Sequence, residues 1–92
     1  MQGLKELLKI FNQIKNEKDM ERLFQEIFTE KERETLSNRW LLMKEIHRNI
    51  PQRDIAQKFH MSLCKITRGA KVLQEKNSLC KQLLDKNHPQ KD

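Results

Sequence analysis

The chain has 92 residues, with 19 Lys+Arg, 13 Asp+Glu and a formal net charge of +6, so we expect one small domain over residues 1–87. No apolar run is long enough to span a bilayer and no signal peptide opens the chain, so we expect no membrane partner, and the two distant cysteines suit a reducing cytoplasm. With only two glycines the chain has no phosphate-binding loop, and no nucleophile–base pair stands out, so we expect no enzyme. The three histidines lack the spacing of metal ligands, so we expect no metal site.

Hydrophobic spacing predicts an all-α chain of about six short helices, since alternating strand patterns are absent. The first helix is expected over residues 2–16, and its apolar stripe consists of Leu4, Leu7, Leu8, Phe11 and Ile14. After a polar break at residues 16–19, a second stripe consists of Met20, Leu23, Phe24, Ile27 and Phe28. A helix lying on a membrane surface is an alternative for residues 4–14, but a core or dimer helix is favoured because the next stripe also needs a partner.

A capping box at residues 29–32, Thr-Glu-Lys-Glu, predicts the start of a third and longer helix that runs to about His47. Its main apolar stripe consists of Leu36, Trp40, Met43 and Ile46, which Leu41 and Leu42 broaden. So wide a face predicts burial on more than one side, with Trp40 as a core or interface anchor. Asn-Ile-Pro at residues 49–51 ends this helix, and Pro51 suits the first turn of the next one.

Residues 51–75 have the pattern of a helix-turn-helix, in which two short helices are joined by a tight turn. Ile55, Ala56 and Phe59 form the apolar face of the first helix. The alanine is small enough for the closest approach of two helices that cross steeply. Residues 60–61 are the predicted turn.

The second helix of this motif is expected to begin after Ser62, whose hydroxyl can accept an early backbone N–H as the N-cap. Its core contacts are expected from Leu63, Ile66 and Leu73. Polar side chains that project elsewhere can reach phosphates and base edges. The predicted DNA-contacting residues of the motif are Gln52, Arg53, Leu63, Cys64, Lys65, Thr67 and Lys71. Any basic amphipathic helix pair has roughly this pattern, so a DNA-binding module without sequence preference is an alternative.

The charge is unevenly placed along the chain. Residues 1–37 hold 7 Lys+Arg and 8 Asp+Glu, a net of −1, whereas residues 38–92 hold 12 and 5, a net of +7. The whole positive excess lies in the half with the helix-turn-helix, which indicates a polyanion partner and, with the motif, double-stranded DNA. A solvated basic surface is the alternative, but it would not predict the asymmetry. A last helix after residues 76–77 and a disordered tail over residues 88–92 complete the prediction. Six short amphipathic helices cannot each bury an apolar face in so small a chain, so we expect a homodimer.

The chain resembles the Trp repressor family in four segments that occur in the same order and approximate spacing. These are Thr-Glu-Lys-Glu-Arg-Glu at 29–34, Arg39, Gln52-Arg53 and Ile-Thr-Arg-Gly at 66–69. The resemblance spans residues 20–84, and the first helix matches only in character. It implies an intertwined all-helical homodimer with L-tryptophan as a corepressor and no other cofactor. Its function would be transcriptional repression at a palindromic operator that controls tryptophan biosynthesis or uptake, with Arg53 resembling the arginine that reaches a guanine edge.

The resemblance also implies a ligand site. The indole would lie between Arg39 and Arg68, one from each subunit, because a guanidinium plane stacks on an aromatic face. The other implied contacts are Thr29 for the carboxylate, Gly69 for close approach of the backbone to the ring, and carbonyls near Glu26 and Phe28 for the ammonium.

The sequence departs from the family pattern at several positions. Val72 stands where the family commonly has a serine that helps to hold the ligand ammonium. Lys65 replaces a smaller polar residue and adds a donor for phosphate or guanine, and the loop before Pro51 is one residue shorter than usual. The alternatives are therefore a ligand-independent helix-turn-helix regulator of the same fold, in which Val72 marks a lost pocket, and a non-specific basic DNA-binding module.

Overall fold

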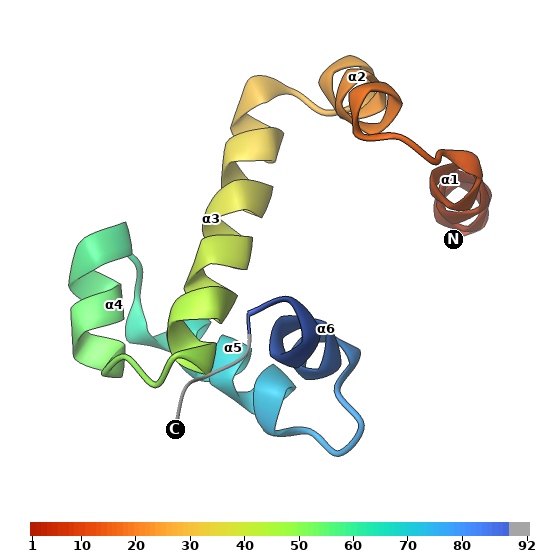
Figure 1. Ribbon diagram of the computed structural model, residues 1–92. Coiled ribbons are helices and arrows are strands. Elements are labelled where there is room, and N and C mark those ends of the chain that lie inside the picture. Colours follow the sequence, from red (N-terminus) through yellow and green to blue (C-terminus); the bar gives the residue numbers. More distant parts are fainter. Residues whose placement is uncertain (89–92) are drawn as a thin grey trace. The chain divides into compact units, whose positions relative to one another are not determined.

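A computed structural model describes residues 1–88, which form six helices and no strand (Figure 1). The helices are α1 (Gln2–Gln13), α2 (Glu17–Ile27), α3 (Glu30–His47), α4 (Gln52–Phe59), α5 (Leu63–Gln74) and α6 (Leu79–Asn87). The all-α prediction is thus confirmed. The homodimer and the single domain over residues 1–87 stay predictions, and residues 89–92 of the predicted tail lie outside the described part. The chain divides into two compact units, Met1–Thr35 and Leu36–Asp92.

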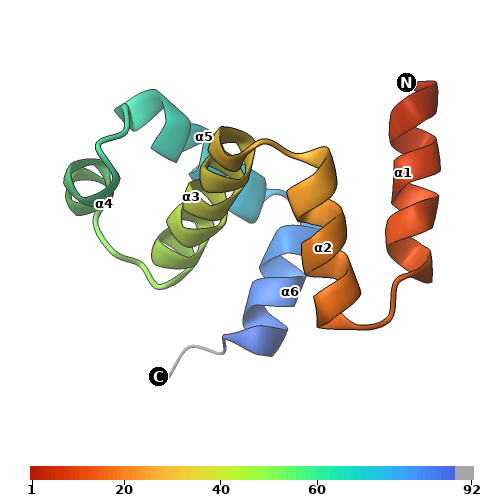
Figure 2. The ribbon, with the colours of Figure 1, turned by 90° about the horizontal axis from the view of Figure 1, so that it is seen from above.

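In the N-terminal unit, α1 and α2 run antiparallel (Figure 2). The Phe11 and Phe24 rings stack across the two helices with centroids 5.3 Å apart. The prediction that the first helix extends to residue 16 and that a break covers residues 16–19 was wrong. Asn16 is the N-cap of α2, since its Oδ1 accepts from the Asp19 N–H at 2.8 Å, and this cap draws the residues after it into the helix.

No residue between positions 1 and 35 is buried. The aromatic cluster covers only one part of each apolar stripe, and Leu4, Leu8 and Ile27 remain exposed. The N-terminal unit therefore has helices with well-defined polar and apolar faces but has no fully desolvated core within this chain.

Polar contacts fix the entry into α3. The predicted capping box is present, because the Glu32 N–H donates to Thr29 Oγ1 at 3.1 Å and the Thr29 N–H donates to Glu32 Oε1 at 2.8 Å. Arg33 Nη1 also donates to the Phe28 and Gln25 carbonyl oxygens, at 2.6 and 3.2 Å. This guanidinium satisfies carbonyls that the end of α2 leaves without a helical partner.

The C-terminal unit has a core of two joined clusters. Leu42, Ile55 and Ile66 form the first, and Met43, Leu73 and Leu84 form the second. Ile46 packs against both clusters, so α3 lies at the centre of this unit. Both views show α4 and α6 on either side of the C-terminal half of α3 (Figures 1 and 2).

The broad apolar face of α3 is only partly used within the chain. Leu42 and Met43 are buried, whereas Leu36, Trp40 and Leu41 are exposed. The role of Trp40 as a core anchor is therefore wrong, and its role at an interface stays a prediction. In the last helix Leu84 is buried, but Leu79 and Leu83 are exposed.

The end of α3 is closed by a residue in the left-handed region. Asn49 has φ 64°, which asparagine tolerates better than most side chains. The Ile50 N–H donates to the Glu45 carbonyl at 3.2 Å and the Asn49 N–H donates to the Ile46 carbonyl at 2.9 Å, the bond pattern of a Schellman cap. Pro51 then occupies the N-cap of α4, one position before the first turn where it was predicted.

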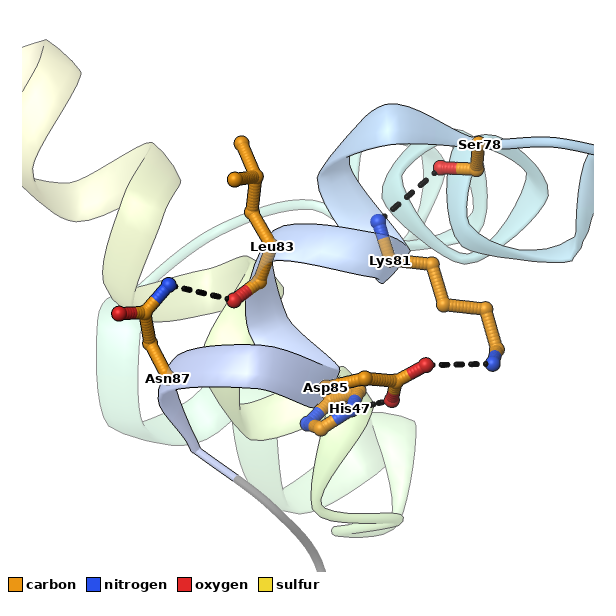
Figure 3. A network of polar contacts seen from close by, with 6 residues as sticks. All are labelled: His47, Ser78, Lys81, Leu83, Asp85 and Asn87. Atoms are coloured by element: carbon orange, nitrogen blue, oxygen red, sulfur yellow. Dashed lines mark hydrogen bonds and ion pairs between the residues drawn. The ribbon is translucent and has the colours of Figure 1, made fainter.

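A polar network joins α6 to α3 (Figure 3). His47, whose side chain is 6% exposed, donates from Nε2 to Asp85 Oδ1 at 2.7 Å, and Lys81 Nζ donates to Asp85 Oδ2 at 3.0 Å. These hydrogen bonds, first that of His47 and then that of Lys81, hold the pKa of Asp85 below its usual value. The carboxylate therefore stays ionised and accepts both bonds.

Candidate nucleic-acid interface

The turn between α4 and α5 has the predicted position. His60 has φ 53° and ψ 43°, a left-handed conformation that ends α4 sharply. The Met61 N–H donates back to the Ala56 carbonyl at 3.1 Å, and the Met61 side chain packs against the Leu42–Ile55–Ile66 cluster. Ala56 and Phe59 pack against the same cluster, as the helix-turn-helix pattern predicted. The relative placement of α4 and α5 is thus set by one turn and one shared core.

Helix α5 has two chemically distinct faces. Its buried residues are Ile66, Gly69, Ala70 and Leu73. Its predicted DNA-contacting residues are all exposed, as are Gln52 and Arg53 at the start of α4. Since a side chain must reach solvent to reach a phosphate or a base edge, the structure leaves every one of these positions available to DNA.

One expectation for the start of α5 was wrong, and another is confirmed only in part. Leu63 was predicted as a core contact but is 56% exposed. Its position at the first residue of α5 places it ahead of the buried face, which begins at Ile66. Ser62 is the N-cap residue, but its hydroxyl makes no capping hydrogen bond. The first turn of α5 contains no acidic residue, so nothing on it repels an anion.

Several cations on this surface have no ion-pair partner. Arg53, Lys65, Arg68 and Lys71 are exposed and form no ion pair with any residue in the described part of the chain. Unpaired cations can neutralise phosphates without first giving up a protein partner. The exposed face of α5 therefore has the charge and the accessibility that a DNA backbone requires.

The residues implied as ligand contacts are distributed over both units. In the C-terminal unit Arg39 and Arg68 are exposed, whereas Gly69 is buried against α3. A Cβ at Gly69 would lie 3.0 Å from Ile46 Cδ1 and 3.1 Å from Met43 Sδ. Close packing of α5 on α3 thus accounts for this glycine without a ligand. The role of Gly69 beside an indole ring stays a prediction.

Val72 is half-buried and packs against the Met43–Leu73–Leu84 cluster. In the N-terminal unit Glu26 and Thr29 are exposed and Phe28 is half-buried. The family resemblance implies carbonyls near Glu26 and Phe28 as acceptors for a ligand ammonium, and the Phe28 carbonyl itself already accepts from Arg33. The Thr29 hydroxyl accepts one bond in the capping box and keeps its own proton for another partner.

Neither cysteine pairs in a disulfide, and burial raises the pKa of the Cys80 thiol, which keeps it protonated. No group of three His, Cys, Asp or Glu side chains in residues 1–88 could hold a metal ion. Within the same range, no helix combines the length and the apolar composition that crossing a membrane requires.

A sequence model of the family described as Trp repressor protein matches residues 2–91. The chain belongs to this family. The match also covers α1, which had been related to the family only in character. Comparisons with curated proteins and with solved structures gave no match. The family is one of DNA-binding transcriptional repressors and not of enzymes, so the chain is a DNA-binding regulator.

One feature of this surface was not predicted from the sequence. Lys58, in the last turn of α4, donates from Nζ to Glu45 Oε1 of α3 at 3.1 Å. The two residues are 13 positions apart and lie on different helices, so no helical spacing rule could have paired them.

Proposed function

We propose that this protein is a tryptophan-dependent repressor that binds a palindromic operator as a homodimer and controls tryptophan biosynthesis or uptake. The observation that carries the proposal is the exposed face of α5, where Lys65, Arg68 and Lys71 have no partner among the described residues, in a chain of the Trp repressor family. Helix-turn-helix dimers, of which the Trp repressor is an established example, bind half-sites about 34 Å apart.

The DNA contacts divide into two chemical kinds. Arg53 resembles the family arginine that reads a guanine edge, so Arg53→Ala should lower discrimination at one position of each half-site by about 1–3 kcal/mol. Lys71 is proposed to contact phosphate, so Lys71→Ala should weaken all sequences alike and reduce the salt slope by about one. Titration of palindromic and scrambled duplexes at several salt concentrations separates the two. Equal losses for Arg53→Ala on both duplexes would make Arg53 a phosphate contact.

The homodimer is supported by apolar surface that the chain does not cover. Leu4, Leu8 and Ile10 of α1 are exposed, and Leu79 and Leu83 of α6 are exposed as well. Surface of this kind is typical of protein interfaces. We expect a thermal midpoint that rises with protein concentration, because dissociation accompanies unfolding of a dimer. Sedimentation as a monomer at micromolar concentration would exclude a dimer that presents two α5 helices to DNA.

L-Tryptophan is proposed to act by population shift. It would bind more tightly to the dimer whose two α5 helices match successive major grooves, and a ligand with equal affinity for every spacing would have no effect. Arg39 and Arg68 would stack on the indole, and the free Thr29 hydroxyl proton would meet the carboxylate.

Calorimetry with indole ligands tests the corepressor role. Val72 offers no hydrogen bond to an ammonium, so indole-3-propionate, which lacks that group, should compete unusually well with tryptophan. Val72→Ser should shift preference toward tryptophan, and Arg68→Ala should abolish the response without unfolding the protein. If no indole acid gives heat or changes operator affinity, the corepressor role is wrong.

A ligand-independent regulator of the same fold is the second candidate. Val72 packs against the core, side chains of α3 occupy the space beside Gly69, and the Phe28 carbonyl accepts a hydrogen bond from Arg33. These three contacts are all satisfied without a ligand. Operator binding of equal strength with and without tryptophan, in excess competitor DNA, would favour this candidate, and equal binding to the competitor would indicate a non-specific module.

A further inference from the structure

The last turn of α3 makes polar contacts with two of the helices packed around it, α4 and α6. Among residues 1–88, an ion pair joins Glu45 to Lys58 of α4, and a hydrogen bond joins His47 to Asp85 of α6. Residues two positions apart lie on roughly opposite sides of a helix, because each residue advances the helix by about 100°. This spacing matches the placement of α4 and α6 on either side of α3 (Figure 1).

Glu45 is more enclosed than an ordinary surface carboxylate. Its side chain is 14% exposed, and its Oε1 lies 3.1 Å from Lys58 Nζ and 3.7 Å from Arg48 Nη1. The Lys58 ammonium also lies 5.6 Å from the centroid of the Phe59 ring. The Lys58 side chain, which is 62% exposed, thus contacts a carboxylate and lies near an aromatic ring.

Helix α4 packs on the core along one face, since Ile55 is buried and Ala56 and Phe59 pack against the same cluster. The ion pair at Lys58 adds a polar contact to α3 beside this packing. Any change in the tilt of so short a helix would move its N-terminal end. Gln52 and Arg53, the proposed DNA contacts of α4, lie at that end, whereas Lys58 lies in the last turn. A contact at Lys58 therefore restrains the direction in which Arg53 points.

We propose that Glu45 is a positioning residue for DNA recognition, which sets the angle of α4 on α3 through Lys58 and so holds Arg53 in register with a base pair. The proposal rests on the proposed role of α4 and α5 in reading DNA. A carboxylate near a DNA-binding surface repels phosphates, so simple electrostatics predicts that its removal tightens binding to every sequence. Positioning predicts instead that its removal lowers binding to the operator relative to random DNA.

The test compares Glu45→Gln with Glu75→Gln, which changes the net charge equally. Glu75 is exposed at the C-cap of α5 and forms no ion pair with the described residues. Affinities of the full-length protein for a palindromic operator duplex and for a scrambled duplex are measured at one salt concentration. Glu45→Gln should lower the ratio of the two affinities by about three- to fivefold, the upper range for a single ion pair. Glu75→Gln should leave the ratio unchanged.

Two further variants separate the effect of the ion pair from that of net charge. Lys58→Gln breaks the same pair but removes a positive charge, so an equal fall in the ratio from both variants cannot be an effect of net charge. The exchange Glu45→Lys with Lys58→Glu restores an ion pair and should recover most of the ratio. Circular dichroism and the thermal midpoint establish that each variant is folded.

A ratio that stays unchanged in Glu45→Gln and Lys58→Gln, in folded protein, overturns the proposal. Failure of the underlying function has a different signature. If Lys65→Ala and Lys71→Ala do not weaken DNA binding, α5 does not contact DNA and the proposed function itself is wrong. If they weaken it while Glu45→Gln behaves like Glu75→Gln, only the positioning role fails.

Discussion

The two compact units of this chain are stabilised in different ways. Residues 1–35 include no buried side chain, carry a net charge of −1 and are joined by stacked aromatic rings and polar caps. The unit that begins at Leu36 buries Leu42, Ile55, Ile66 and Leu84 and carries the whole positive excess. Burial of apolar area is the main source of stability in small domains. The second unit therefore has its own core, whereas the first leaves much of its apolar surface exposed.

The largest expected effect tests this difference directly. Leu84 is 0% exposed, so Leu84→Ala should destabilise the protein by about 2–5 kcal/mol in urea unfolding. Leu83→Ala, at an exposed position of the same helix, is the matched control and should cost much less in a monomer. Leu8 of α1 is 54% exposed, and Leu8→Ala should be equally mild in a monomer. A loss of several kcal/mol at Leu8 would show that a second chain buries α1.

The two glycines give a second contrast. A Cβ at Gly3 would meet nothing within 4 Å, so Gly3→Ala should stabilise α1 by up to about 1 kcal/mol. A Cβ at Gly69 would press on Ile46 and Met43, and an overpacking cost of about 1–3 kcal/mol should exceed the helix-propensity gain. Thermal unfolding of both variants should thus move in opposite directions. Equal stabilisation would show that the Ile46 and Met43 side chains of α3 shift easily to make room for a Cβ at position 69.

Helix caps give a third and smaller contrast. Thr29 accepts a capping bond, so Thr29→Ala should cost about 1 kcal/mol of stability. Ser62 makes no such bond, and Ser62→Ala should cost clearly less. Helicity and thermal midpoint, measured without ligand, provide the comparison. Similar losses at both positions would mean that the Ser62 hydroxyl caps α5 in solution.

The smallest expected effect concerns acid. His47 and Lys81 lower the pKa of Asp85 in the folded protein, so the ionised carboxylate favours folding above the ordinary pKa of 3.8. This contribution disappears as the pH falls through the lowered folded-state pKa. Asp85→Asn should therefore lower stability at about pH 6 and weaken its decline in acid. Urea titrations between pH 2 and 6, about two units on either side of the carboxyl pKa, would reveal both effects. Parallel pH profiles for both proteins would contradict the His47–Asp85 contact.

Local chemistry predicted much of the fold correctly. The capping box at Thr29, the turn after Phe59 and the extent of α3 all depend on bonds within a few residues, so they can be read from neighbouring positions. The boundary between α1 and α2 was missed because Asn16 can either break a helix or cap one. Its choice depends on the Asp19 amide that it reaches.

For the candidate site, the sequence predicted which residues are polar, basic and placed on the motif. It did not predict that Leu63 is exposed or that Gly69 packs on α3, because both depend on where a neighbouring helix lies. For the same reason, the sequence did not predict that Glu45 pairs with Lys58 or that Arg33 donates a hydrogen bond to the Phe28 carbonyl.

The sequence by itself determined the helical class, the helix-turn-helix and the basic C-terminal half, since periodicity, caps and charge are properties of the chain order. Only the tertiary structure decided which apolar residues are buried and which cations are free. Burial and ion pairing depend on contacts between segments far apart in the chain. Leu42 and Leu41 are adjacent leucines on one helix, yet one is in the core and the other is exposed, because only one of them faces α4 and α5.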